Sequence, residues 1–394
     1  MKWEYKTLDQ LGTVSRGKSK HRPRNDPKLF GGKYPFIQTA DVKNADYYIT
    51  KYSDTYNESG LAQSKLWDKG TLCITIAANI ADTGVLAFPA CFPDSIMGFV
   101  PFEGVANTRF IKYCFDRLQR DCKQISQGTA QDNLSWEKLS TIKFCIPEYK
   151  EQCRIADILS AYDDLIENNQ KQIKLLEEAA QRLYKEWFVD LRFPGHENTK
   201  IVDGVPEGWS KSTVGNICKL RKVVITPDKI ESNTPYIGLE HMPRNDICLS
   251  TWGKSEEINS NKFIYLKKDV LFGKIRPYFH KVGFALNDGI TSTDTMVMVA
   301  DQNLWGLLLV TVSSDAFVDF SYQNCKEGAK MPRADWKQME KYAIMIADQA
   351  TQKLFEQEIL VITNKISALA SQCRSLREAR DRMLPKLMGG EVEA

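Results

Sequence analysis

The sequence has few of the spacings that hold a metal ion or a disulfide framework. Ten cysteines are present without one Cys-x-x-Cys pair, and the four histidines lie far apart. Structural zinc sites and disulfide scaffolds use close, recurring cysteine or histidine spacings, so neither pattern is present. We expect reduced thiols and no bound metal.

Long apolar runs are also missing. The run "LWGLLLVTV" from Leu304 is among the longest, and it is far shorter than the roughly 20 residues that cross a bilayer. No signal peptide is recognisable. The chain has 394 residues, a net charge of +3, 43% hydrophobic and 26% charged residues. This composition predicts a soluble globular protein of more than one domain, with no membrane partner.

The familiar catalytic motifs are absent too. The chain contains no G-x-x-x-x-G-K-[ST] phosphate loop, no G-x-G-x-x-G, no H-E-x-x-H and no G-x-S-x-G. It also lacks the Asp/Asn-Pro-Pro-aromatic motif of amino-group methyltransferases. These absences favour a binding protein over an enzyme.

The sequence does contain a long internal repeat. The stretch "GTAQDNLSWEKLSTIKFCI" (128–146) returns in altered form as "GAKMPRADWKQMEKYAIMI" (328–346), 200 residues later. "YPFIQTADV" from Tyr34 has its counterpart in "TPYIGLEHM" from Thr234, again 200 residues later. Solenoid units are only about 20–50 residues long. The repeat therefore indicates tandem duplication of a whole domain.

The first part of each copy is of mixed character. Short β-rich runs, such as "LCITIA" from Leu72 and "VLFGKI" from Val270, are separated by Gly, Pro, Asn and Asp. We therefore expect an α+β globular head in each copy.

The second part of each copy has apolar residues at alternating spacings of four and three. The predicted seam consists of Ile155, Leu159, Tyr162, Ile166, Asn169, Ile173, Leu176 and Leu183 in the first copy, and of Phe355, Ile359, Ile362, Ile366, Leu369, Leu376 and Met383 in the second. Such spacing with a polar opposite face is typical of a coiled coil. The alternative is a helix that lies on the core of a domain, but the narrow seam and the common phase favour coiled-coil pairing.

The order head, helix, head, helix has a geometric consequence. If the two copies pack as a symmetric dimer does, a pseudo-twofold axis makes the helices antiparallel, with a head at each end. Asn169 in the seam either fixes the register or is a tolerated polar residue with access to water. From 155 to 187 a helix rises about 48 Å, of the same order as the 34–36 Å between DNA half-sites read from one face. The helices could therefore act as a ruler between two DNA-reading heads.

Basic residues gather in each head. In the first, the Gly- and Pro-containing stretch "SRGKSKHRPRNDPK" (15–28) predicts a flexible loop suited to phosphate contacts. Arginine suits a bidentate contact with guanine, and lysine suits phosphate. The DNA-binding candidates are Arg16, Lys18, Lys20, Arg22 and Arg24 in the first head, and Arg221, Lys222, Lys274, Arg276, Tyr278 and Lys281 in the second. The alternative for each residue is an ordinary solvated surface position.

The stretch from "GTAQDNLSWEKL" to "KEWFVDLRFPGHE" (128–197) resembles the central conserved region of the DNA specificity subunits of type I restriction-modification systems. "NIADTGVLAFPACFPDSIMGF" (79–99) and "VLFGKIRPYFHKVGFA" (270–285) resemble parts of their target recognition domains. The likeness covers essentially the whole chain. One departure is that "GTAQ" has become "GAKM" and that Ala347 stands where the first copy has Pro147, so the two copies need not make equal contacts with partners.

The resemblance implies an architecture and a role. It divides the chain into a first target recognition domain (1–148), a conserved helix (149–193), a linker with the second target recognition domain (194–348) and a second conserved helix (349–390), the helices forming an antiparallel coiled coil. Such a subunit reads a bipartite DNA target and carries no cofactor. Two modification subunits use S-adenosylmethionine to methylate adenine N6, and restriction subunits use ATP and Mg²⁺. The expected location is the prokaryotic cytoplasm.

Two other interpretations stay open at this point. One is a stand-alone endonuclease or methyltransferase with an unfamiliar site, which would act on DNA without partner subunits. The other is a coiled-coil adaptor without base readout, which would bind DNA, if at all, without sequence preference.

Overall fold

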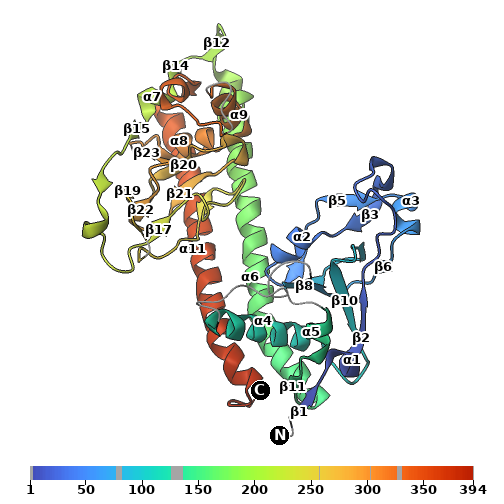
Figure 1. Ribbon diagram of the computed structural model, residues 1–394. Helices are drawn as coiled ribbons and strands as arrows, with labels where there is room; N and C mark the ends of the chain where they lie inside the picture. Colours follow the sequence, from blue (N-terminus) through green and yellow to red (C-terminus); the bar gives the residue numbers. More distant parts are fainter. Residues whose placement is uncertain are drawn as a thin grey trace. The chain divides into compact units, whose positions relative to one another are not determined.

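The computed structural model describes residues 3–76, 82–125, 136–256, 258–301, 303–325 and 331–393. Gly128, Gly328 and Asn79 of the sequence motifs lie outside these ranges. The chain forms two compact units (Figure 1). Unit 1 comprises Met1–Ile166 and Ser375–Ala394, and unit 2 comprises Glu167–Arg374. The division passes through both long helices, so each unit contains a globular head and one segment of each helix.

The head of unit 1 contains short strands and helices. In chain order these are β1 (Glu4–Lys6), α1 (Leu8–Leu11), β2 (Gly12–Arg16), β3 (Phe30–Phe36), α2 (Thr39–Lys43), β4 (Tyr48–Ile49), β5 (Asp54–Tyr56), α3 (Glu58–Ala62), β6 (Leu66–Trp67), β7 (Leu72–Thr75), β8 (Thr83–Leu86), β9 (Ala90–Cys91), β10 (Ile96–Pro101), α4 (Thr108–Ile125), α5 (Trp136–Thr141) and β11 (Phe144–Ile146). β1 and β11 pair antiparallel, so that the two ends of the head meet.

Besides the pair of β1 and β11, this head contains two larger sheets and a helix layer. The main sheet has the order β2-β10-β7-β8-β4, and the second has the order β5-β3-β9-β6. Successive side chains of a strand point to opposite faces. Leu72 and Ile74 of β7 accordingly belong to the core that contains α4, whereas Cys73 belongs to the core beside the second sheet. Both faces of the main sheet are therefore buried, which explains the continuous apolar run in this strand.

The head of unit 2 has a corresponding set of elements. They are β12 (Ile201–Val202), β13 (Val205–Pro206), β14 (Ser210–Thr213), α7 (Val214–Ile217), β15 (Lys219–Leu220), β16 (Val224–Ile225), β17 (Tyr236–Ile237), β18 (Cys248–Leu249), β19 (Lys262–Tyr265), β20 (Val270–Gly273), β21 (Val282–Ala285), β22 (Gly289–Thr291), β23 (Thr295–Val299), α8 (Trp305–Val312), α9 (Asp315–Gln323), α10 (Trp336–Met339) and β24 (Ala343–Ile346). Its main sheet, β15-β23-β20-β21-β18, follows the order of β2-β10-β7-β8-β4.

The two heads share more than strand order. In each main sheet only the last pair is parallel, β4 with β8 and β18 with β21, and β4 and β18 begin at Tyr48 and Cys248, 200 residues apart. The clasp of β1 with β11 recurs as β14 with β24. The predicted tandem duplication and the α+β class are confirmed.

The second sheets differ at one edge. β3-β9-β6 corresponds to β17-β22-β19, with the first pair parallel and the second antiparallel in both heads. The fourth strand lies beside β3 in unit 1, as β5, but beside β19 in unit 2, as β16. The heads therefore keep a common scaffold while their outer edges diverge.

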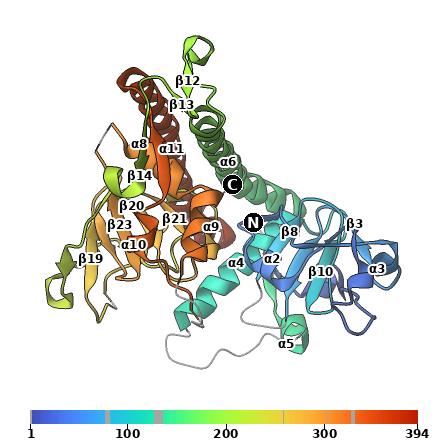
Figure 2. The same cartoon turned by 90° about the horizontal axis from the view of Figure 1, so that it is seen from above.

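The long helices are α6 (Tyr149–Tyr184) and α11 (Gln349–Met388). In unit 2 their segments run antiparallel. Asn169 contacts Gln372, whereas the ring of Phe188, further along the chain, has its centre 4.8 Å from that of Phe355, near the start of α11. In unit 1 Asp163 of α6 pairs with Arg380 of α11. In unit 2, α8 lies beside α11 in both views (Figures 1 and 2).

The buried face of each helix includes the predicted seam and is wider than the seam. All seam residues are buried or half-buried, with Ile155, Leu159, Phe355 and Ile359 at most 1% exposed. Phe355 also belongs to one core with residues of the unit 2 sheet. Each helix therefore pairs with the other helix and lies on a head core at once. Asn169 Nδ2 donates to Gln372 Oε1 at 3.4 Å, which gives this polar seam residue a partner.

The end of the first helix differs from the sequence expectation. The first conserved helix was expected over 149–193, before Pro194 and Gly195, but α6 ends at Tyr184 and a π-helical turn, Lys185–Val189, follows. The wider turn places Trp187 and Phe188 side by side in the core against Phe355. α11 ends at Met388, directly before two glycines.

Candidate nucleic-acid interface

The basic stretch of unit 1 forms the connection between β2 and β3. It begins at Gly17, where a Cβ atom would lie 2.2 Å from the carbonyl oxygen of Phe92. Only glycine permits so close an approach. Lys18 and Lys20 are exposed on either side of Ser19, which is 5% exposed. The alternation directs both lysines to the surface from an anchored backbone.

This loop is held in place, contrary to the expectation of flexibility. Ser64 Oγ donates to the carbonyl oxygen of Lys18 at 2.7 Å, and the main-chain N–H of His21 donates to Gln63 Oε1 at 3.0 Å. Both partners come after α3 in sequence, more than 40 residues away. These tertiary hydrogen bonds, which no local pattern shows, fix the loop despite its glycine and prolines.

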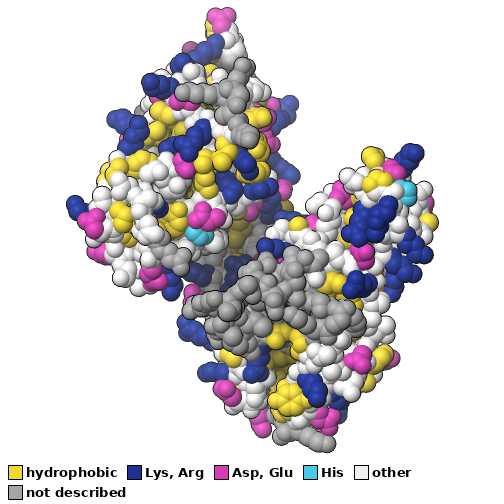
Figure 3. Space-filling model, in the orientation of Figure 1, with side chains coloured by type: hydrophobic (Ala, Val, Ile, Leu, Met, Phe, Trp, Pro, Cys, Tyr) yellow, Lys and Arg dark blue, Asp and Glu magenta, His cyan; other side chains and the backbone are white. Residues whose placement is uncertain are grey.

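The arginines of the loop are engaged to different degrees. Arg22 Nη1 donates to the carbonyl oxygen of Ser19 at 2.5 Å, and Arg24 forms an ion pair of 2.7 Å with Asp94. Both arginines are exposed, and exposed ion pairs contribute little stability, so a phosphate can replace the carboxylate of Asp94. Lys and Arg side chains gather on the part of unit 1 that carries β3, β5 and α3 (Figure 3).

In unit 2 the candidates centre on the hairpin turn between β20 and β21. A short 3₁₀ turn, Pro277–Phe279, is flanked by Arg276 and His280, both with φ of 51°. Residues other than glycine rarely adopt this left-handed backbone conformation, and such strained positions cluster at functional sites. The Arg276 N–H donates to the Pro332 carbonyl at 2.9 Å, which helps to hold the turn.

An aromatic and basic group surrounds this turn. The Arg244 guanidinium lies 3.9 Å from the centre of the Phe279 ring, and that of Arg276 lies 5.8 Å from it. Tyr278 packs edge-on against Tyr322 at 5.3 Å, and both rings are nearly half exposed. We call Arg244, Arg276, Tyr278, Phe279 and Tyr322 the hairpin cluster. It can offer cations to phosphates or guanine and ring faces to bases.

Three of the other predicted residues make contacts within the head. Arg221 pairs with Asp269 at 2.8 Å. Lys274 Nζ donates to the Thr293 carbonyl at 2.6 Å, and Lys281 Nζ donates to the Leu239 carbonyl. Burial lowers the pKa of both lysines. Lys222, in contrast, is exposed.

Arg244 and Tyr322 were not among the predicted residues. Arg244 is 35 residues from the ring over which it lies, so their proximity depends on the tertiary fold. One signal was present, because Pro243–Asp246 repeats the four letters of Pro23–Asp26 in the basic loop of the first head. Tyr322 lies in α9 and had no comparable signal.

The described part of the chain holds no group of three or more His, Cys, Asp or Glu side chains that could bind a metal ion. Among the helices described, none is long and apolar enough to cross a membrane. The basic loop of unit 1 and the hairpin cluster of unit 2 have side chains suited to binding an anionic, ring-containing polymer.

Comparison with known proteins agrees with this arrangement. Residues 1–178 match the model of the type I restriction modification DNA specificity domain. The specificity subunit of the type I restriction enzyme MjaIX of Methanocaldococcus jannaschii is 25% identical over 99% of this chain and 93% of that protein. The corresponding EcoDI subunit of Escherichia coli is 20% identical over 86% of this chain and 76% of that protein.

A solved structure shares the fold. The S subunit of a type I restriction-modification system from M. genitalium superposes with a TM-score of 0.55 at 16% sequence identity, covering 98% of this chain and 96% of that one. This structure confirms the expected fold, and the matches of the sequence confirm the resemblance noted there.

Proposed function

We propose that this chain, as a member of the family of type I restriction-modification DNA specificity subunits, recognises a bipartite DNA sequence. It would direct its partner subunits to that sequence. The partners would methylate adenine N6 in the target or restrict DNA that lacks the methyl groups. The chain itself would supply recognition without chemistry.

One observation carries this proposal: a single scaffold occurs twice, with different exposed basic groups on each copy. The main sheets have the same strand order, yet unit 1 presents the loop around Lys18 and Lys20, and unit 2 presents the hairpin cluster. Two readers with one fold and different surfaces suit a target with two unlike halves. In this arrangement the lysines neutralise phosphates, and Arg244, Arg276 and Tyr278 approach bases.

The helices suit the spacing of such a target. α6 is a continuous helix of 36 residues, with a rise of about 54 Å. Adding or removing one residue in a helix displaces the remainder of that helix by about 1.5 Å and rotates it by about 100°. We therefore assign to α6 and α11 the role of fixing the length of the unread spacer.

The helices also offer surfaces to partners. Leu165 in unit 1 and Leu175, Leu354 and Val361 in unit 2 are large apolar side chains between 48% and 67% exposed. Exposed apolar residues on a surface often mark protein interfaces. Two modification subunits, which would carry S-adenosylmethionine, are the partners that we expect there, with restriction subunits supplying ATP- and Mg²⁺-dependent cleavage.

The test is modification-sensitive sequencing of genomic DNA from cells that carry this gene with its methyltransferase partner, compared with cells that lack only this gene. A split motif with N6-methyladenine that disappears with the gene supports the proposal. Unchanged methylation in an otherwise active system would favour the adaptor interpretation. Purified chain that methylates or cuts DNA alone would favour the enzyme.

A further inference from the structure

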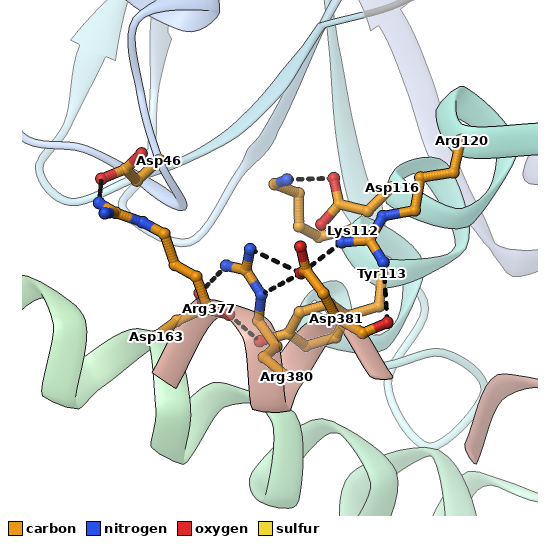
Figure 4. Close-up of polar contacts among 9 residues, drawn as sticks. All are labelled: Asp46, Lys112, Tyr113, Asp116, Arg120, Asp163, Arg377, Arg380 and Asp381. Carbon is orange, nitrogen blue, oxygen red and sulfur yellow. Dashed lines mark hydrogen bonds and ion pairs between the residues drawn. The ribbon is translucent and has the colours of Figure 1, made fainter. Parts of the chain in front are cut away.

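A network of charged side chains joins α4, α6 and α11 within unit 1 (Figure 4). Asp163 of α6, whose side chain is 3% exposed, pairs with Arg380 of α11 and accepts a hydrogen bond of 2.5 Å from the hydroxyl of Tyr113. Arg380 also contacts Asp381, with which Arg120 forms a second ion pair. The pair of Asp163 and Arg380 is thus the buried centre of the contact between the two helices in this unit.

The duplicated positions in unit 2 carry no charge. Because the two copies are offset by 200 residues, Asp163 corresponds to Thr363 and Arg380 corresponds to Ala180. Thr363 is 2% exposed and donates to the carbonyl oxygen of Ile359 within its own helix, and Ala180 is fully buried. The ion pair therefore breaks the symmetry of the repeated helix interface, as Asn169 does at the position of Leu369.

The asymmetry separates the pairings that the duplication would allow. Since α6 and α11 share one seam pattern, α6 could also pair with α6 of a second copy of the chain, and α11 with α11. In the first case Asp163 would face Ala180, and in the second Arg380 would face Thr363. In the first case Asp163, whose side chain is 3% exposed, is left without an opposite charge, which is strongly unfavourable. In the second case Arg380, whose side chain is 18% exposed, loses Asp163 and keeps only Asp381 of its own helix. Only α6 against α11 joins the two charges.

We propose that the ion pair of Asp163 and Arg380 selects the helix partner: it permits α6 to pair with α11 and rejects pairing of either helix with its own kind from a second copy of this chain. The charges act as polar seam residues do in coiled coils, where they specify partner and register at some cost in stability. This inference concerns assembly of the chain and does not depend on the proposed function.

The test uses full-length chains with changed charges. Asp163→Arg and Arg380→Asp each place two like charges together when the helices pair within one chain. When these two variants are unfolded together and refolded as a mixture, α6 of one can meet α11 of the other with the opposite charges paired again. Light scattering should then show a two-chain species in the mixture, which is absent from either variant alone and from the wild type.

A second variant tests the rejection of like helices. Asp163→Thr combined with Arg380→Ala makes unit 1 match unit 2 and removes both charges, so it leaves no buried charge unpaired at these two positions. After the same refolding, this variant alone should form a two-chain species. Arg377→Gln is the matched control, since it breaks an ion pair from α11 to Asp46 of the head and leaves the helix contact unchanged. It should stay a single chain.

Two results would overturn the proposal. In the first, Asp163→Arg and Arg380→Asp are each single chains with the thermal stability of the wild type, and their refolded mixture contains no two-chain species. In the second, the Asp163→Thr, Arg380→Ala variant remains as completely single-chain as the wild type.

Discussion

Arg244 lies over the ring of Phe279, with its guanidinium carbon 3.9 Å from the ring centre. The two residues come from different connections of the unit 2 head, and the strained turn after Arg276 presents the ring. A guanidinium supported by a ring keeps its plane defined, which favours a bidentate contact with guanine. The contact makes Arg244 the best single candidate for base readout in this head.

Arg244→Ala is expected to weaken binding of the target by the assembled complex by about 1–3 kcal/mol and to relax the preference at one position of the second half-site. Arg244→Lys should keep part of the affinity and lose the preference. Fluorescence anisotropy with target DNA and with singly substituted half-sites measures both effects. Arg382→Ala, on the exposed side of α11, is the control. Equal affinity and unchanged preference for Arg244→Ala would remove the residue from the reading surface.

Lys18 and Lys20 are expected to act on phosphates. Lys18→Gln with Lys20→Gln should make binding by the assembled complex less dependent on salt, because each lost phosphate contact reduces the slope of log K against log salt by about 0.9. The preferred sequence should not change, since phosphate contacts carry no direct sequence information. The matched control is Lys171→Gln, an exposed lysine paired with Glu167 on α6. A slope equal to that of the wild type would contradict the assignment.

Glu177 of α6 gives a prediction on pH. Its carboxylate accepts the main-chain N–H groups of Ile247 and Cys248, and it is 4% exposed. Burial is the main cause that raises the pKa of Glu177 to about 7 from 4.5, and neighbouring Asp246 adds to it, while Lys174 opposes it. Because the folded state holds this proton more tightly than the unfolded state, stability is highest below the unfolded pKa and falls as the pH rises to about 7.

Thermal unfolding from pH 4.5 to 8 measures this effect. Over this pH range the free energy of unfolding of the wild type should fall by at most about 3 kcal/mol more than that of Glu177→Gln. Glutamine keeps the accepting oxygen but carries no charge that titrates. Glu178→Gln, one residue further on α6 and paired with Arg182 at the surface, is the control and should follow the wild type. Parallel pH profiles for Glu177→Gln and the wild type would show that the carboxylate does not titrate in this window.

The helices are expected to set the spacer of the target. One heptad inserted after Gln170 in α6 and one after Ser371 in α11 keeps the seam in phase and adds about 10.5 Å, the length of about three base pairs. The methylated motif should show a changed spacer with the same half-sites. The control is an insertion of seven residues at Gly204, in the exposed β12–β13 turn, which should change neither the spacer nor the half-sites. A constant spacer after the heptad insertions would end the ruler hypothesis.

The periodic part of the fold was predictable from the sequence. The seam from Ile155 to Leu183 has a spacing that any buried helix pair requires, and the 200-residue repeat implied two heads of one topology. The width of the buried face of each helix was less predictable, because it includes the charged residues Glu177 and Glu356. Each of these carboxylates accepts main-chain N–H groups of the head. Glu356 accepts the N–H groups of Gly306 and Leu307 at the start of α8, and Gly306 leaves the room for it.

The candidate surfaces were only partly predictable. Composition located the basic loop, but not the hydrogen bonds with Gln63 and Ser64 that hold it. Composition also could not separate Lys222, which is exposed, from Lys274, whose charge is bound by a carbonyl group inside the head. Such distinctions arise from contacts between residues that are distant in sequence, which single-chain patterns do not encode.

The clasp of β1 with β11 has a consequence for how such a protein can vary. Glu4 pairs with Ile146, and Tyr149 begins the long helix only three residues later. The chain thus enters and leaves the head at neighbouring points, and in unit 2 Ser210 and Ile346 repeat the arrangement. We infer that the loops between the clasped strands that lie away from the long helices can lengthen or shorten without shifting the first turn of the helix, whereas α4 and α8, which contact those helices, are retained.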